Sequence, residues 1–293
     1  MIDLHIHTTY SDGADTVIEV LKNAEKLKLE YISITDHDNC NVYKELESLD
    51  IKDYFSGKII PGIEIKCAYK GRLMEVLGYK INPKKMQAWA DEYYKNKTRS
   101  TLQQKYFNMT YDNCIKHGFY LDKKENIKFD ANKDWATVSM YKELIKDERN
   151  RKIGEPDLLN DFNNFSKKYC GNPGHFLYID KSKDYPTVEE TINAIKNSDG
   201  LVFLPHVFIY RWAEDKKKFL EEILSNYKVD GIECMHSEFS EEEIDYLLDF
   251  CDKNNYYKSG GSDYHGKNKV GIELAVGKGN LKIGKKLIED WVE

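Results

Sequence analysis

Hydrophobic and polar positions follow two patterns along the chain: short apolar runs, and longer stretches in which apolar residues recur every three or four positions. Residues 1–13, MIDLHIHTTYSDG, show the first pattern. In an extended strand the apolar side chains would lie on one face, with His5 and His7 on the other, about 6.5 Å apart along the strand. Residues 15–29 show the second pattern, which predicts an amphipathic helix after the first strand.

The same succession recurs later in the chain. Thr187 and Ser240 each precede a glutamate by three positions, which is the capping-box signature of a helix start. Glu64 and Glu75 are acidic residues inside otherwise apolar runs. The patterns predict strands at 31–35, 58–65, 72–81, 201–204, 229–234 and 256–259, and helices at 187–197, 215–227, 240–252 and 280–292.

Strands that alternate with amphipathic helices predict an α/β fold with a parallel sheet. Roughly seven such units favour a distorted or incomplete (β/α)7 barrel, related to the TIM barrel, with its site at the C-terminal rim. Residues 83–185 differ, being charged, aromatic-rich and mainly helical by pattern. We therefore expect a barrel formed by residues 1–82 and 186–293, with a helical region inserted between them.

Composition narrows the class of protein. The net charge of −6 and the pI near 5.8 argue against binding to duplex nucleic acid, which requires a basic face. The six cysteines are dispersed, as expected for reduced thiols in the cytoplasm. No apolar run approaches the ~20 residues of a membrane span, and no targeting segment precedes the first strand. These features predict a cytoplasmic protein and leave the oligomeric state open.

Polar residues with metal-ligand chemistry gather at the predicted strand ends. Their nitrogen and oxygen donors suit zinc, manganese or iron. The number of these donors exceeds what a single ion requires. A centre of two or three divalent ions could lower the pKa of a bridging water and bind phosphoryl oxygens, which favours phosphate ester hydrolysis. The candidate ligands are His5, His7, Asp12, His37, Glu64, His206, Asp263 and His265, with Glu75 as a further candidate.

These residues resemble the motifs of the PHP (polymerase and histidinol phosphatase) domain, especially its stand-alone bacterial phosphoesterases. The resemblance covers about residues 1–82 and 186–275. It rests on the following segments: Asp3-Leu-His5-Ile-His7 with Ser11-Asp12-Gly13, Ile34-Thr35-Asp36-His37-Asp38, Pro61-Gly62-Ile-Glu64-Ile, the His206 element, and Gly261-Ser-Asp263-Tyr-His265.

The resemblance implies a distorted seven-stranded barrel and a partition of the ligands. One ion would be held by His5, His7, Glu64 and Asp263. Glu64 would bridge to a second ion held by His206, and a third ion would be held by Asp12, His37 and His265.

The chain departs from the family pattern at three places. Glu75 stands where the family usually has histidine, so a second ion would have harder coordination or be weakened. Ala136-Thr-Val-Ser-Met140 lacks the Arg-x-His element of relatives that act on nucleotides, which argues against a nucleotide substrate. Val207 replaces a proline after His206, a change we expect to be tolerated.

Other polar residues admit two interpretations each. Asp36 could orient a ligand histidine or be a turn residue, and we favour the first. Arg211 could clamp a phosphate or be a solvated loop residue. His117 has the position of a helix-end residue beside Gly118. We leave His117, His175 and His236 out of the predicted site, although His175 or His236 could touch substrate.

The leading hypothesis is a metal-dependent phosphoesterase that hydrolyses a phosphate monoester of a small metabolite through a metal-bridged water. A nucleotide and a histidinol-phosphate-like compound are both within that class. The inserted helices would cap the pocket and set specificity. One alternative is an amidohydrolase-like enzyme for C–N or C–O bonds, disfavoured because we expect no strand-embedded lysine for carbamylation. The other is a catalytically impaired PHP module that binds a partner, for which Glu75 is the discriminating residue.

Overall fold

The computed structural model describes residues 1–292 and divides the chain into two compact units. Unit 1 contains Met1–Glu92 and the chain from Tyr185 onward, and unit 2 is Tyr93–Asp184. The expected insertion, 83–185, began ten residues earlier than unit 2 does. Within the described residues, no helix combines the length and the apolar composition needed to cross a membrane.

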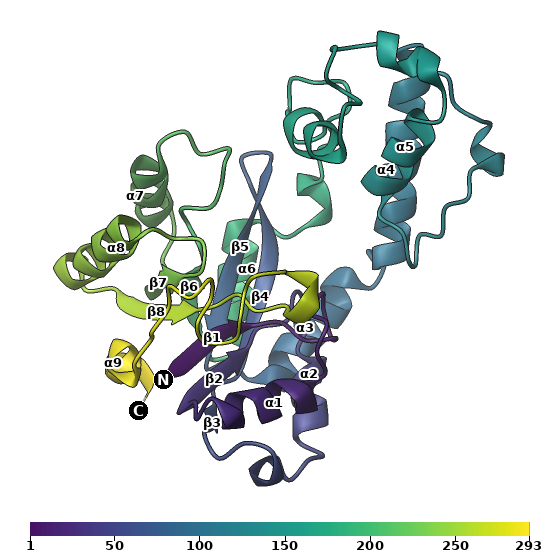
Figure 1. Cartoon of the computed structure of the whole chain (residues 1–293). Coiled ribbons are helices and arrows are strands. Elements are labelled where there is room, and N and C mark those ends of the chain that lie inside the picture. Colours follow the sequence, from purple (N-terminus) through teal and green to yellow (C-terminus); the bar gives the residue numbers. More distant parts are fainter. Residues whose placement is uncertain (293) are drawn as a thin grey trace. The chain divides into compact units, whose positions relative to one another are not determined.

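Two sheets form the centre of unit 1 (Figure 1). The three-stranded sheet is parallel, in the order β1 (Ile2–Ile6), β2 (Tyr31–Ile34) and β3 (Lys58–Ile59). The five-stranded sheet has the order β4 (Gly62–Tyr69), β5 (Arg72–Tyr79), β6 (Leu201–Leu204), β7 (Gly231–His236) and β8 (Tyr257–Gly261).

The expectation of a parallel sheet is wrong for β5, which runs antiparallel to both β4 and β6. The turn from β4 to β5 consists of Lys70 and Gly71, both with positive φ. A two-residue turn of that conformation forces the chain straight back along its own strand. Strands β6, β7 and β8 are parallel, as predicted. The fold is therefore mixed α/β.

Isolated bridges connect the ends of the two sheets. Ile6 at the end of β1 pairs with Tyr264 just after β8, and His37 just after β2 pairs with Glu64 in β4. Backbone hydrogen bonds support both connections: His7 N–H donates to the Tyr264 carbonyl, and Asp38 N–H donates to the Glu64 carbonyl, each at 2.9 Å. The C-terminal end of β1 thus meets that of β8, and the C-terminal end of β2 meets the beginning of β4.

Helices of unit 1 follow the strands. Capping boxes begin three of them, at Thr16, Thr187 and Ser240, where hydroxyl and glutamate satisfy free backbone N–H groups. The α-helices of this part are α1 (Val17–Lys26), α2 (Asn41–Leu46), α3 (Pro83–Tyr94), α6 (Val188–Asn197), α7 (Lys216–Asn226), α8 (Glu241–Asn254) and α9 (Glu289–Val292).

The predicted helix at 280–292 is only partly correct. A 3-10 turn, Lys285–Ile288, leads into the short α9. The preceding residues are not helical, because the Ile283 carbonyl accepts a hydrogen bond from the Ile2 N–H of β1 at 2.9 Å. In this segment, backbone pairing with β1 determines the conformation, although the spacing of apolar residues predicts a helix.

Unit 2 is mainly helical and has its own hydrophobic core. Helices α4 (Arg99–Lys116) and α5 (Ala136–Leu144) lie side by side (Figure 1). Phe107, Met140 and Phe165 are buried in a cluster that contains no residue of the unit 1 core. A separate core indicates that unit 2 is a distinct packing unit.

Candidate metal centre

The first strand places two histidines in the interior of unit 1. His5 and His7 are fully buried, and their ring centroids lie 5.2 Å apart. The Nε2 atom of each ring lies 3.2 Å from Oε2 of Glu64. The alternation inferred for residues 1–13 therefore does direct both rings to one place.

Glu64 is the carboxylate that these rings share. Its Oε2 also lies 3.3 Å from Nδ1 of His37, and its Oε1 lies 2.8 Å from Nε2 of His206. Burial alone would raise the pKa of Glu64, but attraction to His5 and His37 and the contact with His206 hold it well below its usual range. A single buried anion thus contacts four imidazoles from three segments of the chain.

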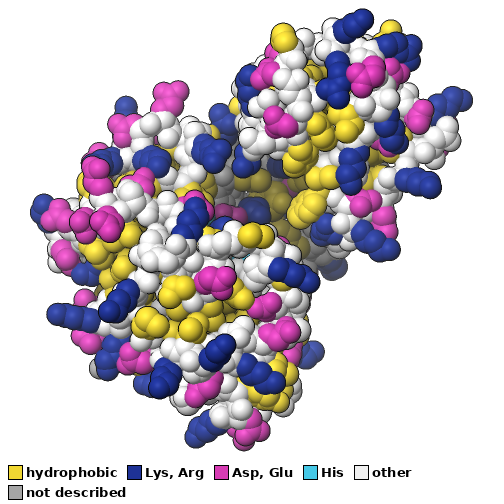
Figure 2. Space-filling model, in the orientation of Figure 1, with side chains coloured by type: hydrophobic (Ala, Val, Ile, Leu, Met, Phe, Trp, Pro, Cys, Tyr) yellow, Lys and Arg dark blue, Asp and Glu magenta, His cyan; other side chains and the backbone are white. Residues whose placement is uncertain are grey.

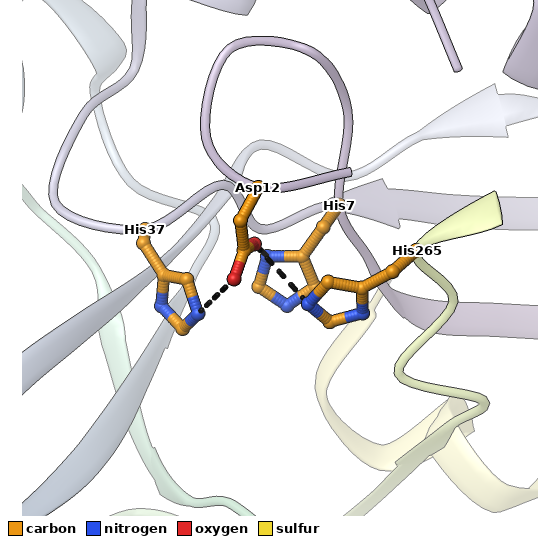
Figure 3. Close-up of side chains that lie close together, drawn as sticks. All are labelled: His7, Asp12, His37 and His265. Carbon is orange, nitrogen blue, oxygen red and sulfur yellow. Dashed lines mark ion pairs between the residues drawn. The ribbon is translucent and has the colours of Figure 1, made fainter. Parts of the chain in front are cut away.

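Asp12 gathers a second set of rings (Figure 3). Its Oδ1 lies 3.1 Å from Nε2 of His265 and 3.7 Å from Nδ1 of His7, and its Oδ2 lies 3.7 Å from Nε2 of His37. The Asp12 side chain is 51% exposed, so this group lies at the solvent side of the site. His7 and His37 belong to both sets, which joins the sets into one cluster.

Asp263 and Glu75 complete the arrangement. Asp263 Oδ1 lies 3.4 Å from His7 Nε2, 3.4 Å from His265 Nδ1 and 3.7 Å from His5 Nε2. Glu75 Oε2 lies 3.5 Å from Nε2 of His206. The structure therefore brings all nine predicted ligands together, and we call them the cluster: His5, His7, Asp12, His37, Glu64, Glu75, His206, Asp263 and His265.

Four ring nitrogens in the cluster lack a hydrogen-bond partner among the described residues. They are His5 Nε2, His7 Nε2, His37 Nδ1 and His206 Nδ1, and all four are buried. Buried polar atoms are almost always satisfied in folded proteins, so each such atom requires an explanation. Three groups of donors lie close enough to share an ion: His5, His7 and Glu64; His7, Asp12, His37 and His265; and His37, Glu64 and Glu75. The donor set fits a metal centre.

In two of the histidines, the hydrogen-bond partner of Nδ1 determines that Nε2 is the nitrogen available to bind an ion. His5 Nδ1 lies 2.8 Å from a carboxylate oxygen of Glu233, and His265 Nδ1 lies 2.9 Å from the Asp263 carbonyl. Both partners can only accept, so Nδ1 carries the proton and, in the neutral ring, Nε2 presents a lone pair. These rings are held as the tautomer that a metal ligand needs.

Asp36 acts on the cluster through a turn. Its carboxylate accepts hydrogen bonds from Thr8 N–H at 2.8 Å, Thr8 Oγ1 at 2.6 Å and Ser11 Oγ at 2.6 Å. The Ser11 oxygen in turn lies 3.4 Å from His7 Nδ1, and Asp12 follows directly. Asp36 is thus linked to His7 through Ser11 and not by direct contact, and its orienting role stays a prediction.

Arg211 is not brought into the cluster by any interaction within residues 1–292. Its side chain is exposed, and it forms neither a hydrogen bond nor an ion pair with a described residue. A phosphate clamp at Arg211 stays a prediction. His117 and His175 belong to unit 2, where His117 caps α4 and His175 pairs with Glu155.

His236, which is not part of the predicted site, lies against the cluster. His236 ends β7, is fully buried, and places Nε2 3.3 Å from Oδ2 of Asp263. Its Nδ1 accepts the Glu238 N–H at 3.1 Å, so Nε2 carries the proton and donates to Asp263. Glu233, also missed, contacts His5 and accepts the His206 N–H at 2.7 Å. The predicted strand ended two residues early, which concealed that His236 is a strand-end histidine.

The expected absence of a strand-embedded lysine is also wrong. Lys66 lies in β4, with Nζ 3.4 Å from Oε1 of Glu75. Burial lowers the pKa of its ammonium, but attraction to Glu75 and Asp38 outweighs this effect and raises the pKa above its usual value. The absence of a strand-embedded lysine therefore no longer argues against amidohydrolase-like chemistry.

Comparison with known proteins identifies the family. The sequence model of the PHP domain family matches residues 3–261 of this chain. The chain belongs to the PHP domain family. The match runs from β1 to the end of β8, contains seven of the nine cluster residues, and confirms the resemblance drawn from the motifs; Asp263 and His265 follow it directly.

Characterised relatives of this PHP protein are distant in sequence. A phosphoribosyl 1,2-cyclic phosphate 1,2-diphosphodiesterase of Eggerthella lenta is 23% identical, covering 90% of this chain and 94% of the relative. A 5′–3′ exoribonuclease of Escherichia coli is 21% identical over 90% of this chain and 84% of its own. A 3′,5′-nucleoside bisphosphate phosphatase of Chromobacterium violaceum is 21% identical, covering 93% of this chain and 90% of the relative.

Two solved structures share the fold. A protein from Bifidobacterium adolescentis described as a metal-dependent phosphoesterase has a TM-score of 0.60 at 21% identity, covering 99% of this chain and 94% of its own. A protein from Chromobacterium violaceum described as an amidohydrolase has a TM-score of 0.61 at 19% identity, covering 90% and 87%. At these identities the similarity establishes the fold alone.

Proposed function

We propose that this PHP protein is a metal-dependent phosphoesterase that hydrolyses a phosphate monoester of a small metabolite. The observation that carries the proposal is a group of buried imidazole nitrogens that make no hydrogen bond among the described residues. His5 Nε2, His7 Nε2 and His37 Nδ1 converge on Oε2 of Glu64 at 3.2–3.3 Å, and His206 Nδ1 is the fourth. Such a group is costly to bury unless the lone pairs bind a cation. The relatives named above act on phosphate esters or phosphodiesters, which supports the same class of reaction.

The proposed ligand sets follow the family partition. His5, His7, Glu64 and Asp263 would hold one ion, His206 and Glu75 would share Glu64 with a second, and Asp12, His37 and His265 would hold a third. Zinc, manganese or iron fits these nitrogen and oxygen donors. When bound, such ions supply Lewis acidity toward phosphoryl oxygens and lower the pKa of a coordinated water.

The side chains around the ligands have positioning roles in this proposal. Glu233 and Ser11 hold the Nδ1 protons of His5 and His7, which keeps their Nε2 lone pairs directed inward. His236 donates its Nε2 proton to Asp263 and fixes that carboxylate. Partners of this kind usually alter metal affinity about 10–100-fold when removed.

We also propose the finer architecture expected from the sequence. The bridges Ile6–Tyr264 and His37–Glu64 would join the two sheets into a distorted barrel, which has seven strands when β3 and β4, two residues apart in the chain, are counted as one. The ligands would then line its C-terminal rim, where this class of fold carries its sites. A role for unit 2 in substrate selection, and a cytoplasmic location, stay predictions.

The test combines metal analysis with product analysis. Purified protein is analysed for bound zinc, manganese and iron, and then supplied with phosphomonoesters, a cyclic phosphodiester, a nucleoside bisphosphate, a 5′-phosphorylated oligoribonucleotide and a set of amides. We expect one or more transition metals per chain and phosphate release that chelator abolishes. Hydrolysis indifferent to chelator would overturn the proposal, and turnover of amides alone would favour the amidohydrolase-like reaction.

The impaired binding module makes a different prediction at Glu75. If the chain has lost a metal and its activity, Glu75→His should raise the metal content and create phosphate release where wild type has none. If wild type is already active, this alternative fails.

A further inference from the structure

Two carboxylates of the cluster are partly exposed to solvent. His5, Glu64, His206 and Asp263 are buried. The side chain of Asp12 is 51% exposed, and that of Glu75 is 19% exposed. A substrate that reaches the cluster must enter past these exposed members. Because both are carboxylates, an anionic substrate meets negative charge there unless a cation offsets it.

Lys66 is positioned to provide that cation. It lies two residues after Glu64 in β4, so the two side chains share a face of the sheet. It is the direct cross-strand partner of Glu75 in β5. Its side chain is 31% exposed, so the ammonium lies where the cluster meets solvent.

The ammonium of Lys66 also has unused hydrogen-bonding capacity. Its Nζ lies 3.4 Å from Glu75 Oε1, an ion pair, and it makes no hydrogen bond within residues 1–292. An ammonium has three donors. Lys269, equally exposed beside the cluster, differs because its ammonium is hydrogen-bonded to Asp263. Of the two lysines, Lys66 is the one with donors left for a ligand.

Lys66 is held in place by its own backbone and by its neighbours. Its N–H donates to Asp38 Oδ1 at 3.1 Å, so Asp38 and Glu75 flank it on two sides. Most of its side chain is buried, which limits where the ammonium can go. The arrangement keeps a positive charge at the open edge of the cluster.

We propose that Lys66 is a substrate-binding residue that donates hydrogen bonds to the phosphoryl group at the Glu75 edge of the cluster. This inference rests on the proposed function, because it assigns the ligand of the same site. It gives Lys66 the task of recognising the oxyanion, while the cluster residues hold the ions.

The experiment measures binding of inorganic phosphate to the metal-loaded protein by calorimetry, together with metal content and steady-state kinetics. Lys66→Gln removes the charge, Lys66→Arg retains it, and Lys70→Gln is the matched control. Lys70 lies four residues further on, at the β4–β5 turn, and pairs with Glu222 at the surface. We expect Lys66→Gln to weaken phosphate binding about tenfold or more and to raise KM, with metal content unchanged.

Lys66→Arg should recover part of the affinity, and Lys70→Gln should behave as wild type. The inference is overturned if Lys66→Gln binds phosphate as wild type does. It is also overturned if that variant loses metal in proportion to phosphate, because Lys66 would then serve only to support Glu75. Failure of the proposed function looks different: wild type itself would lack metal and phosphate release.

Discussion

At the scale of single residues, Glu64 decides whether the cluster exists. Four imidazoles approach its two oxygens, and it is the one carboxylate of the cluster within 4 Å of both His37 and His5 in the described residues. Removing its charge would leave the rings facing one another in a buried space. Buried imidazoles that face one another without an anion between them destabilise the fold, because their polar nitrogens lack a partner.

We therefore predict that Glu64→Gln lowers metal affinity by at least about 100-fold. Removing a residue that only hydrogen-bonds to a ligand has a smaller effect. Metal content after dialysis and phosphate release measure the effect. Glu242→Gln, on the exposed face of α8, is the control and should match wild type. Unchanged metal content in Glu64→Gln would contradict the shared-carboxylate role.

Histidine protonation gives a second prediction at this scale, for the metal-free protein. Burial lowers the pKa of His7, but its close contacts with the carboxylates of Asp263 and Glu64 raise it from 6.5 to about 9. The pKa of His5 is also raised, by Glu233 and Glu64 against the effect of burial. A raised pKa means that the protonated rings stabilise the fold below pH 6.5, and that this contribution is lost as pH rises through about 9.

Urea unfolding of the metal-free protein should accordingly show a free energy of unfolding that falls between pH 6.5 and pH 9.5. Metal affinity should rise over the same range, because neutral imidazoles bind metal. His7→Gln should reduce the pH dependence of stability. A free energy that is constant or rising across this range would disprove the assignment.

At the scale of elements, the turn between β1 and α1 carries Asp12. Gly13 follows, and a Cβ there would lie 2.3 Å from the His7 carbonyl oxygen, closer than real contacts allow. The obstruction is backbone, so the turn itself would have to move. The position of Asp12 therefore depends on a glycine at this point.

We predict that Gly13→Ala displaces Asp12 and reduces the number of metal ions bound, with a loss of activity. Gly284→Ala is the matched control, because a Cβ there has open space and φ is negative. Metal stoichiometry distinguishes the two variants. Equal stoichiometry in Gly13→Ala and wild type would show that the turn is not required.

At the scale of the whole molecule, the two units differ in charge. Unit 2 carries 18 Lys and Arg against 13 Asp and Glu, so the net charge of −6 conceals a basic unit 2 and a more strongly acidic unit 1. Figure 2 shows charged side chains of both signs over the visible surface and almost no histidine. The argument against nucleic acid from net charge applies to the chain as a whole and not to unit 2, so this expectation stays a prediction.

Separate cores predict separate responses to mutation. Phe165 is fully buried in unit 2, and Phe→Ala changes in cores cost about 3–5 kcal/mol. We expect Phe165→Ala to increase amide hydrogen exchange in α4 and α5 while metal content, set in unit 1, stays the same. Loss of metal in this variant would show that the two units are coupled.

Much of the local structure could be read from the sequence. β6 has the predicted bounds, and the capping boxes at Thr187 and Ser240 begin helices as expected. These features depend on neighbours within four residues, which the sequence displays directly. The end of β7 and the segment before α9 were predicted wrongly, because both depend on pairing with distant strands.

The sequence by itself determined which donors this protein owns, because metal-ligand residue types at strand ends are visible as a pattern. Only the tertiary structure decided that nine of them meet around Glu64, that His236 and Glu233 support them, and that Lys66 faces Glu75. The physical reason is that a side chain's direction follows from its own strand, whereas its neighbours follow from how strands far apart in the chain pair. Backbone pairing such as His37 with Glu64 sets those distances.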